Sequence, residues 1–260
     1  MGKVYLVGAG PGAPDLLTLR AARLLAQADI VFFDALVHRD TLALATNARL
    51  VDVGKRSGRA STEQRFTNRA LVEAARTHAT VVRLKGGDPM LFGRAQEEID
   101  ALKAAGVEFE VVPGITAATA ASASLGISLT RRGVSRHVAF VTPRTGTDQQ
   151  PTEWLEAAAA ADTVALYMAA SQSREVATQL IGAGRKPSTP VIFIENVSLA
   201  NERRVPTSLD ALRQQAAAPA FEGPVLMLVG EVFAEFTQGA MEHEAEMRFA
   251  VSERCRARSA

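Results

Sequence analysis

The residues best placed to do chemistry lie at 81–98, in the run VVRLKGGDPMLFGRAQEE. A short apolar run with strand character ends in Gly86, Gly87 and Asp88, and helical character begins near Arg94. Adjacent glycines let a second molecule approach the backbone closely, or allow φ angles that a Cβ would forbid. Ligands of parallel α/β sheets bind beyond the carboxyl ends of the strands, so this loop is predicted to cradle a ligand. A glycine bulge that closes the strand, with Asp88 capping a turn, is the alternative.

The loop after the first apolar run points to another ligand. Gly8, Gly10 and Ala13 match the relaxed GxGxxG/A dinucleotide fingerprint, and Asp34 follows 21 residues after Ala13, where an acid would bind ribose. By itself this pattern indicates a nicotinamide oxidoreductase. Prolines at positions 11 and 14 argue against it, because each removes a backbone N–H that a pyrophosphate would need. A donor-poor loop suits a ligand without phosphates, and a purely structural turn stays open as well.

Two further features complete the candidate site. The segment PGIT at 113–116 opens a run of small residues, and it either brings backbone close to a ligand or begins a helix capped by Thr116. Each cationic side chain near the predicted strand ends would by itself be ordinary solvated surface. Several of them together could bind a polycarboxylate through paired hydrogen bonds. These cations are Lys55, Arg56, Arg94, Arg131, Arg132 and Arg136.

Alternating strand-like and helix-like runs are predicted to position these residues. We expect strands at 4–7, 30–33, 49–53, 81–86, 109–112, 137–142, 163–168, 191–195 and 225–229. We expect helices at 16–28, 63–77, 94–105, 116–124, 154–161 and 174–183. This rhythm indicates βαβ units and a parallel sheet. The fold class is therefore α/β, with two α/β domains at 1–114 and 115–240, mainly parallel or mixed sheets, and a charged tail at 241–260.

Composition narrows the class of protein. The 260 residues are 47% hydrophobic and 22% charged, with a formal net charge of +1, so nothing draws the chain generally to nucleic acid or to a membrane surface. No run approaches the roughly 18 apolar residues that span a bilayer, and no signal-peptide core is present at the N-terminus. One cysteine and four scattered histidines predict neither a disulfide nor a metal site. We expect a cytoplasmic protein that needs no metal.

Seven motifs carry a resemblance to a known family. They are GAGPGAPDLLT, FFDALV, VGKR, VRLKGGDPMLFGR, PGITAATAA, GISLTRR and YMA. In this order, over about residues 4–233, they resemble the tetrapyrrole methylases, and within that family they are most similar to members that methylate uroporphyrinogen III. The chain departs from the family pattern at Ala13, which is usually Asp, and at Ala95 and Gln96, which are usually Gly-Gly. It also departs at 195–198, where ENVS replaces a glycine-containing ENGT.

The resemblance implies the tetrapyrrole methylase fold of the class III methyltransferases, with the active site in the cleft between the domains. There the family binds S-adenosylmethionine, largely through backbone groups. Asp34 is implied as the proton acceptor and Lys55 as the proton donor. Arg94, Glu97 and Arg132 are implied to hold the substrate. The implied cofactor positions are Pro11, Gly86, Gly87, Asp88, Leu91, Thr116, Ala117, Met168, Val197 and Val225.

The implied activity is methylation of uroporphyrinogen III at C2 and C7, giving precorrin-2 through precorrin-1 for sirohaem and cobalamin biosynthesis. S-adenosylhomocysteine is the second product, and a homodimer is expected. The bifunctional sirohaem synthases carry a further dehydrogenase–chelatase domain for which this chain has no room, so methylation is expected to stand alone. Three alternatives stay open: a later precorrin methyltransferase, the nicotinamide oxidoreductase, and a tetrapyrrole carrier without enzymatic activity.

Overall fold

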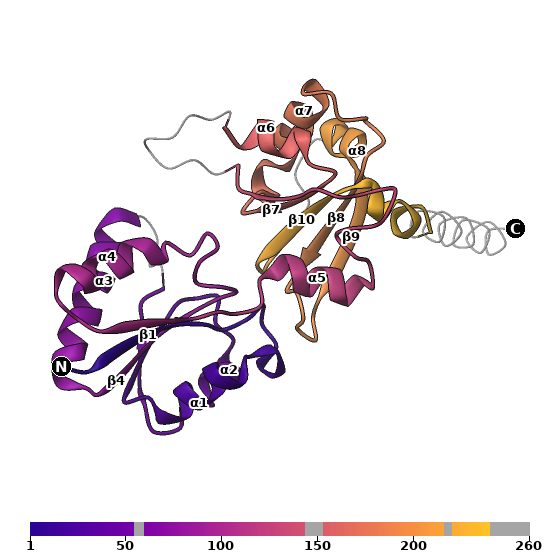
Figure 1. Cartoon of the computed structure of the whole chain (residues 1–260). Helices are drawn as coiled ribbons and strands as arrows, with labels where there is room; N and C mark the ends of the chain where they lie inside the picture. Colours follow the sequence, from indigo (N-terminus) through magenta and orange to yellow (C-terminus); the bar gives the residue numbers. More distant parts are fainter. Residues whose placement is uncertain (55–59, 144–152, 216–219, 240–260) are drawn as a thin grey trace, which may run out of the picture. The chain divides into compact units, whose positions relative to one another are not determined.

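The computed structural model describes residues 1–54, 60–143, 153–215 and 220–239 (Figure 1). The chain divides into two compact units, Met1–Ala120 and Ala121–Ala260, and each contains a five-stranded sheet. The sequence analysis put the boundary after residue 114, and this division falls after Ala120. The expected tail at 241–260 lies outside the described residues.

The sheet of the first unit is entirely parallel. Its strands are β1 (Lys3–Gly8), β2 (Ile30–Phe33), β3 (Arg49–Asp52), β4 (Thr80–Lys85) and β5 (Phe109–Val112), in the order β3-β2-β4-β1-β5. In register, Val7 of β1 lies between Leu84 of β4 and Val112 of β5. Because all five strands run the same way, the loops that follow them all leave from one edge of the sheet.

Helices cover both faces of this sheet (Figure 1). On one face, α3 (Ala60–Thr77) and α4 (Ala95–Ala104) pack over a buried cluster that includes Leu6, Leu71 and Leu102. On the other face, α1 (Leu19–Gln27) and the short α2 (Arg39–Leu42) pack over a cluster that includes Leu25 and Leu84.

The first helix begins later than the sequence suggested. A 3-10 turn, η1 (Pro14–Leu16), precedes α1, and the predicted helical run from residue 16 becomes helix only at Leu19. Thr18 explains the shift, because its hydroxyl accepts a 3.1 Å hydrogen bond from the amide of Ala21 and caps the helix.

The sheet of the second unit is mixed. Its strands are β6 (Val138–Val141), β7 (Thr163–Tyr167), β8 (Pro190–Glu195), β9 (Arg203–Ser208) and β10 (Val225–Gly230), in the order β6-β7-β10-β8-β9. Only β6 and β7 pair in parallel, whereas the other three pairings are antiparallel. The edge strand β9 was not predicted, because its sequence RRVPTS lacks apolar alternation and carries a proline, as edge strands can.

Three helices cover one face of this second sheet: α6 (Glu153–Ala160), α7 (Ser173–Gly182) and α8 (Leu209–Gln214). They bury a core that includes Leu166, Leu180 and Phe193. The remaining elements are α5 (Ala117–Leu125) and two 3-10 turns, η2 (Ala170–Gln172) and η3 (Glu231–Phe233). Among the described residues, no helix combines the length and apolar character needed to cross a bilayer.

Candidate active site

Three loops interlock at the carboxyl edge of the parallel sheet. They follow β1 (residues 9–13), β4 (residues 86–94) and β5 (residues 113–116). Gly10 and Gly87 exchange two backbone hydrogen bonds, of 3.2 and 2.7 Å. A Cβ on Gly8 would lie 2.6 Å from the Cα of Gly114, which is closer than real contacts allow. Glycine is therefore required here so that the backbones of two loops can touch.

Asp88 fastens two of these loops together. Its Oδ1 accepts a 2.8 Å hydrogen bond from the amide of Met90, and its Oδ2 accepts a 2.9 Å bond from the amide of Gly114. The turn-capping interpretation of Asp88 is therefore correct, and the second bond adds a tie to the loop after β5. A ligand contact by Asp88 stays a prediction.

The two glycines after β4 serve different purposes. A Cβ on Gly86 would lie 2.6 Å from the Cβ of Leu36, so Gly86 admits a neighbouring side chain. Gly87 has φ +68°, and apart from Gly87 and its two chain neighbours no atom of the described residues lies within 4 Å of the position its Cβ would occupy. Gly87 therefore presents open backbone, which is the feature expected where a ligand approaches.

Asp34 follows β2 at the same edge. Its Oδ1 accepts a 3.1 Å hydrogen bond from the amide of Leu36, and its Oδ2 lies 3.5 Å from Nη2 of Arg83. The Asp34 side chain keeps 25% of its surface exposed, so its carboxylate is partly accessible to solvent. Lys55, the predicted proton donor, lies outside the described residues.

A buried charge cluster lies next to Asp34. Glu98 of α4 is fully buried, and its carboxylate binds Nε of Arg83 at 3.0 Å and Nζ of Lys85 at 3.0 Å with each oxygen. Burial lowers the pKa of Lys85 below its usual value, and the neighbouring Arg83 cation adds to the effect while Glu98 opposes it. Gln64 of α3 donates a 3.3 Å hydrogen bond to Glu98.

The sequence analysis missed this cluster. The available signal was a pair of cations, Arg83 and Lys85, two positions apart in an otherwise apolar strand. Residues at that spacing point to the same face, here the face covered by α3 and α4. Nothing in the local sequence shows that Glu98 of α4, rather than its neighbour Glu97, faces them.

Arg94 and Glu97, both predicted to hold substrate, contact each other. The guanidinium binds the carboxylate with two hydrogen bonds, of 2.7 Å from Nε and 2.8 Å from Nη2, and both side chains are about half exposed. The hydrogen bond that Arg94 donates to the Glu97 carboxylate raises the pKa of Arg94 above its usual value. The loop after β4 and the start of α4 also line a hollow of about 250 Å³, with Pro89 and Gln96 at the two ends of the lining segment.

Several residues at or next to the predicted site positions have a left-handed backbone conformation. Among the described residues, the non-glycine residues with positive φ are Phe92, Arg94, Met168, Asn196 and Ser198. Two of these are predicted site residues, and Asn196 and Ser198 flank the predicted Val197. Such conformations typically cost 1–3 kcal/mol each, and they cluster at functional sites.

The other predicted residues are spread over both units. In the first unit, Pro11, Leu91, Thr116 and Ala117 are partly buried, and Ala117 begins α5. In the second unit, Met168 is exposed directly after β7, whereas Val197 is buried after β8. Val225 begins β10 opposite Glu195, and Arg132 is exposed in a turn closed by Arg131 and Ser135.

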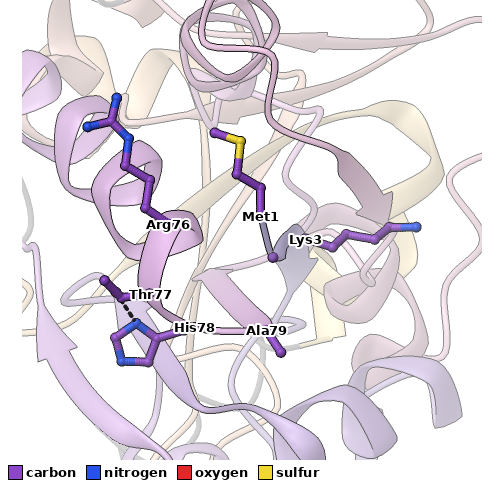
Figure 2. A pocket seen from close by; sticks show the side chains of 7 residues that line it. Met1, Lys3, Arg76, Thr77, His78 and Ala79 are labelled. Atoms are coloured by element: carbon purple, nitrogen blue, oxygen red, sulfur yellow. Dashed lines mark hydrogen bonds between the residues drawn. The ribbon is translucent and has the colours of Figure 1, made fainter.

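A second hollow lies at the opposite edge of the first sheet, where β1 and β4 begin (Figure 2). Its volume is about 410 Å³, and Met1, Lys3, Arg76 and His78 are among the lining residues. Figure 2 shows the charged ends of Lys3 and Arg76 pointing away from each other, and Lys3 is paired with Glu108 at 2.9 Å. No predicted site residue lies in this hollow. Within the described part of the chain, no group of three or more His, Cys, Asp or Glu residues could hold a metal ion.

Comparisons with known proteins identify a matching family and relatives of similar sequence. Residues 3–213 match the family described as Tetrapyrrole (Corrin/Porphyrin) Methylases. A uroporphyrinogen-III C-methyltransferase of Pseudomonas aeruginosa is 45% identical over 231 residues, which cover 89% of this chain and 94% of that protein. A siroheme synthase of Psychromonas ingrahamii is 47% identical over 89% of this chain, but only 49% of that protein is covered. The chain thus spans about half the length of the siroheme synthases that it matches.

One solved structure is similar to this chain in its fold as well as in its sequence. It is the uroporphyrin-III C-methyl transferase of Thermus thermophilus complexed with S-adenyl homocysteine. Its sequence is 40% identical, the TM-score is 0.79, and the match covers 90% of this chain and 99% of that one. The fold of the two α/β units is therefore one that binds S-adenyl homocysteine in the T. thermophilus protein, and this ligand is a methyl donor that has lost its methyl group.

Proposed function

Because the chain belongs to the tetrapyrrole (corrin/porphyrin) methylases, we propose that it methylates uroporphyrinogen III at C2 and C7 with S-adenosylmethionine, giving precorrin-2 through precorrin-1. The observation that carries the proposal is the arrangement at the carboxyl edge of the parallel sheet, where the three loops interlock. The open backbone of Gly87 and the carboxylate of Asp34 both lie at this edge. The relatives of P. aeruginosa and T. thermophilus, which are named as C-methyltransferases of uroporphyrinogen III and uroporphyrin III, support it.

The first unit offers groups that fit S-adenosylmethionine. The open space at Gly87 is a cradle that any Cβ would fill, and the prolines at positions 11 and 14 suit a ligand without phosphates. In our proposal Pro11, Gly86, Gly87, Leu91 and the Thr116–Ala117 segment hold the cofactor, while Asp88 keeps the loops in place. Met168, Val197 and Val225 of the second unit complete the set.

When bound, S-adenosylmethionine would supply a sulfonium methyl group for transfer to a pyrrole carbon, and its thioether would be the leaving group that keeps the electron pair of the S–CH₃ bond. The role of the protein is largely positioning, which can contribute about 7–11 kcal/mol when reactants are held in near-attack geometry. The methylated ring system must then lose a proton from an adjacent bridge carbon. The partly exposed position of Asp34 suits it as the acceptor, and Lys55 is proposed as the donor.

The substrate carries eight carboxylates, so guanidinium partners are expected. In the structure the fork of Arg94 faces the Glu97 carboxylate. We propose that a carboxylate of the substrate binds the Arg94 guanidinium in the same way as the Glu97 carboxylate does in this structure. Arg132 is the proposed second cation. We further propose a cytoplasmic homodimer whose product serves sirohaem and cobalamin biosynthesis.

The test is an anaerobic incubation with uroporphyrinogen III and S-adenosylmethionine, followed by mass spectrometry. The expected product has gained two methyl groups, and its oxidised form fluoresces red. Turnover of a later precorrin without methylation of uroporphyrinogen III would replace the proposal with a later corrin-ring methylase. Calorimetry with S-adenosylhomocysteine and NAD in parallel addresses the oxidoreductase alternative, which NAD binding alone would favour. Tetrapyrrole binding without any turnover would favour the carrier.

A further inference from the structure

We propose that Arg83 is a positioning residue for the methyl transfer. The buried Glu98 carboxylate binds the guanidinium of Arg83, and this guanidinium in turn orients the carboxylate of Asp34. The inference rests on the proposed function, in which Asp34 accepts the proton that the methylated substrate releases.

The guanidinium of Arg83 is anchored on several sides. Nε donates to Glu98 at 3.0 Å, and Nη1 donates to the carbonyl oxygen of Leu84 at 3.0 Å and to that of Phe32 at 3.5 Å. Its side chain is only 7% exposed. A guanidinium has five N–H groups in a rigid fork, so fixing Nε and Nη1 also fixes the direction of Nη2, which points to Asp34 at 3.5 Å.

The charges of the cluster give Arg83 a purpose beyond packing. Lys85 and Glu98 already form an electrically complete buried pair, with 3.0 Å from the ammonium to each carboxylate oxygen. Arg83 adds a second buried cation, and an unmatched buried charge is strongly unfavourable. Among the described residues, Asp34 is the second acidic group that faces Arg83, at 3.5 Å from Nη2. The cluster therefore places two carboxylates, those of Glu98 and Asp34, against its two buried cations.

Asp34 gains a two-point hold from this arrangement. The amide of Leu36 fixes one carboxylate oxygen and Arg83 faces the other, so the plane of the carboxylate is set. A proton acceptor must lie within hydrogen-bond reach of the proton that it takes. A displacement of about 1 Å can lower a rate by about 100-fold.

The test compares two substitutions in the 260-residue chain. Arg83→Met leaves the Lys85–Glu98 pair balanced, so the variant should fold, and we expect kcat to fall about 10- to 100-fold. The KM for uroporphyrinogen III and the Kd for S-adenosylhomocysteine should stay within about twofold, because in the proposal Arg83 contacts neither ligand. Arg69→Met, in an exposed ion pair with Glu73, controls for loss of an arginine.

An isotope effect separates positioning from a general loss of structure. With deuterium at the bridge carbon that loses the proton, the kinetic isotope effect should increase in Arg83→Met and stay unchanged in Arg69→Met. If Arg83→Met does not fold, Arg83→Lys replaces it: this variant keeps the charge but is too short to span Glu98 and Asp34, and it should show the same isotope effect. Equal losses of kcat in the Arg83 and Arg69 variants, or an unchanged rate without Arg83, would overturn the inference. Failure of the unsubstituted protein to methylate uroporphyrinogen III would instead overturn the proposed function.

Discussion

Replacing Gly87 with alanine tests the cofactor cradle directly, because the chain contains a matched control. Gly87 has φ +68° and Gly106 has φ +65°, and at both positions the described residues beyond the two chain neighbours leave 4 Å of open space around a would-be Cβ. Gly106 follows the carboxyl end of α4, away from the strand-end loops. Gly87→Ala and Gly106→Ala therefore place the same methyl group on the same backbone conformation, once at the proposed site and once remote from it.

The expected magnitudes follow from this geometry. An L-residue in the left-handed region costs about 1–2 kcal/mol, so both variants should melt at temperatures lower by roughly 2–8 °C, at about 2–4 °C per kcal/mol for a chain of this size. If cofactor atoms pack against Gly87, the new methyl group adds an overpacking cost of about 1–3 kcal/mol. That cost corresponds to a Kd raised about 5- to 150-fold, and only for Gly87→Ala.

The assay is isothermal titration of S-adenosylhomocysteine into both variants and the unsubstituted protein, alongside their thermal unfolding. We expect the two variants to match in melting temperature and to differ in Kd. Equal Kd values in the two variants would show that no ligand approaches the backbone at Gly87. The cradle interpretation of this loop would then be wrong.

Three further predictions concern the residues around this loop. Gly114→Ala should destabilise the protein by about 1–3 kcal/mol and also weaken cofactor binding, since its Cβ would lie 2.8 Å from the Cα of Gly8; unchanged unfolding in denaturant would contradict the interlocked loops. Asp88→Asn should cost about 1–3 kcal/mol, because an amide can accept only one of the two backbone hydrogen bonds and leaves a donor unsatisfied; if instead the melting temperature holds while S-adenosylhomocysteine binding falls, Asp88 is a ligand and not a fastener. Burial lowers the pKa of Lys85 below 10.5, so between the folded and unfolded pKa values the unfolded chain binds more protons and this site adds stability as the pH rises. Melting curves of Lys85→Met should lack that rise towards pH 10.5, and a parallel pH dependence in both proteins would refute the assignment.

The convergence of the loops could be predicted from the sequence. Regular alternation of strands and helices in the first unit indicates parallel strands, and parallel strands place all their carboxyl ends at one edge. Asp34, Gly87 and Thr116 could therefore be assigned to one site without knowing any contact between them. The predicted strands of that unit agree with the observed ones to within one or two residues.

The second unit was harder to predict. Its strand-helix rhythm resembles that of the first unit, yet three of its four strand pairings are antiparallel and β9 was missed. Strand order and direction depend on which strands meet across the sheet. A local pattern of apolar residues contains no information on that choice.

The sequence alone determined the class of fold, the family and the types of residue at the site, because periodicity and ordered motifs are local properties of the chain. Tertiary structure decided what those residues contact. It joined Asp88 to Gly114, gave Arg94 the carboxylate of Glu97, and turned Glu98 of α4 inward to Arg83 and Lys85. These partners come from separate loops or from the packing of a helix on a strand. Their distances are set by how the layers of the unit stack, which no single segment encodes.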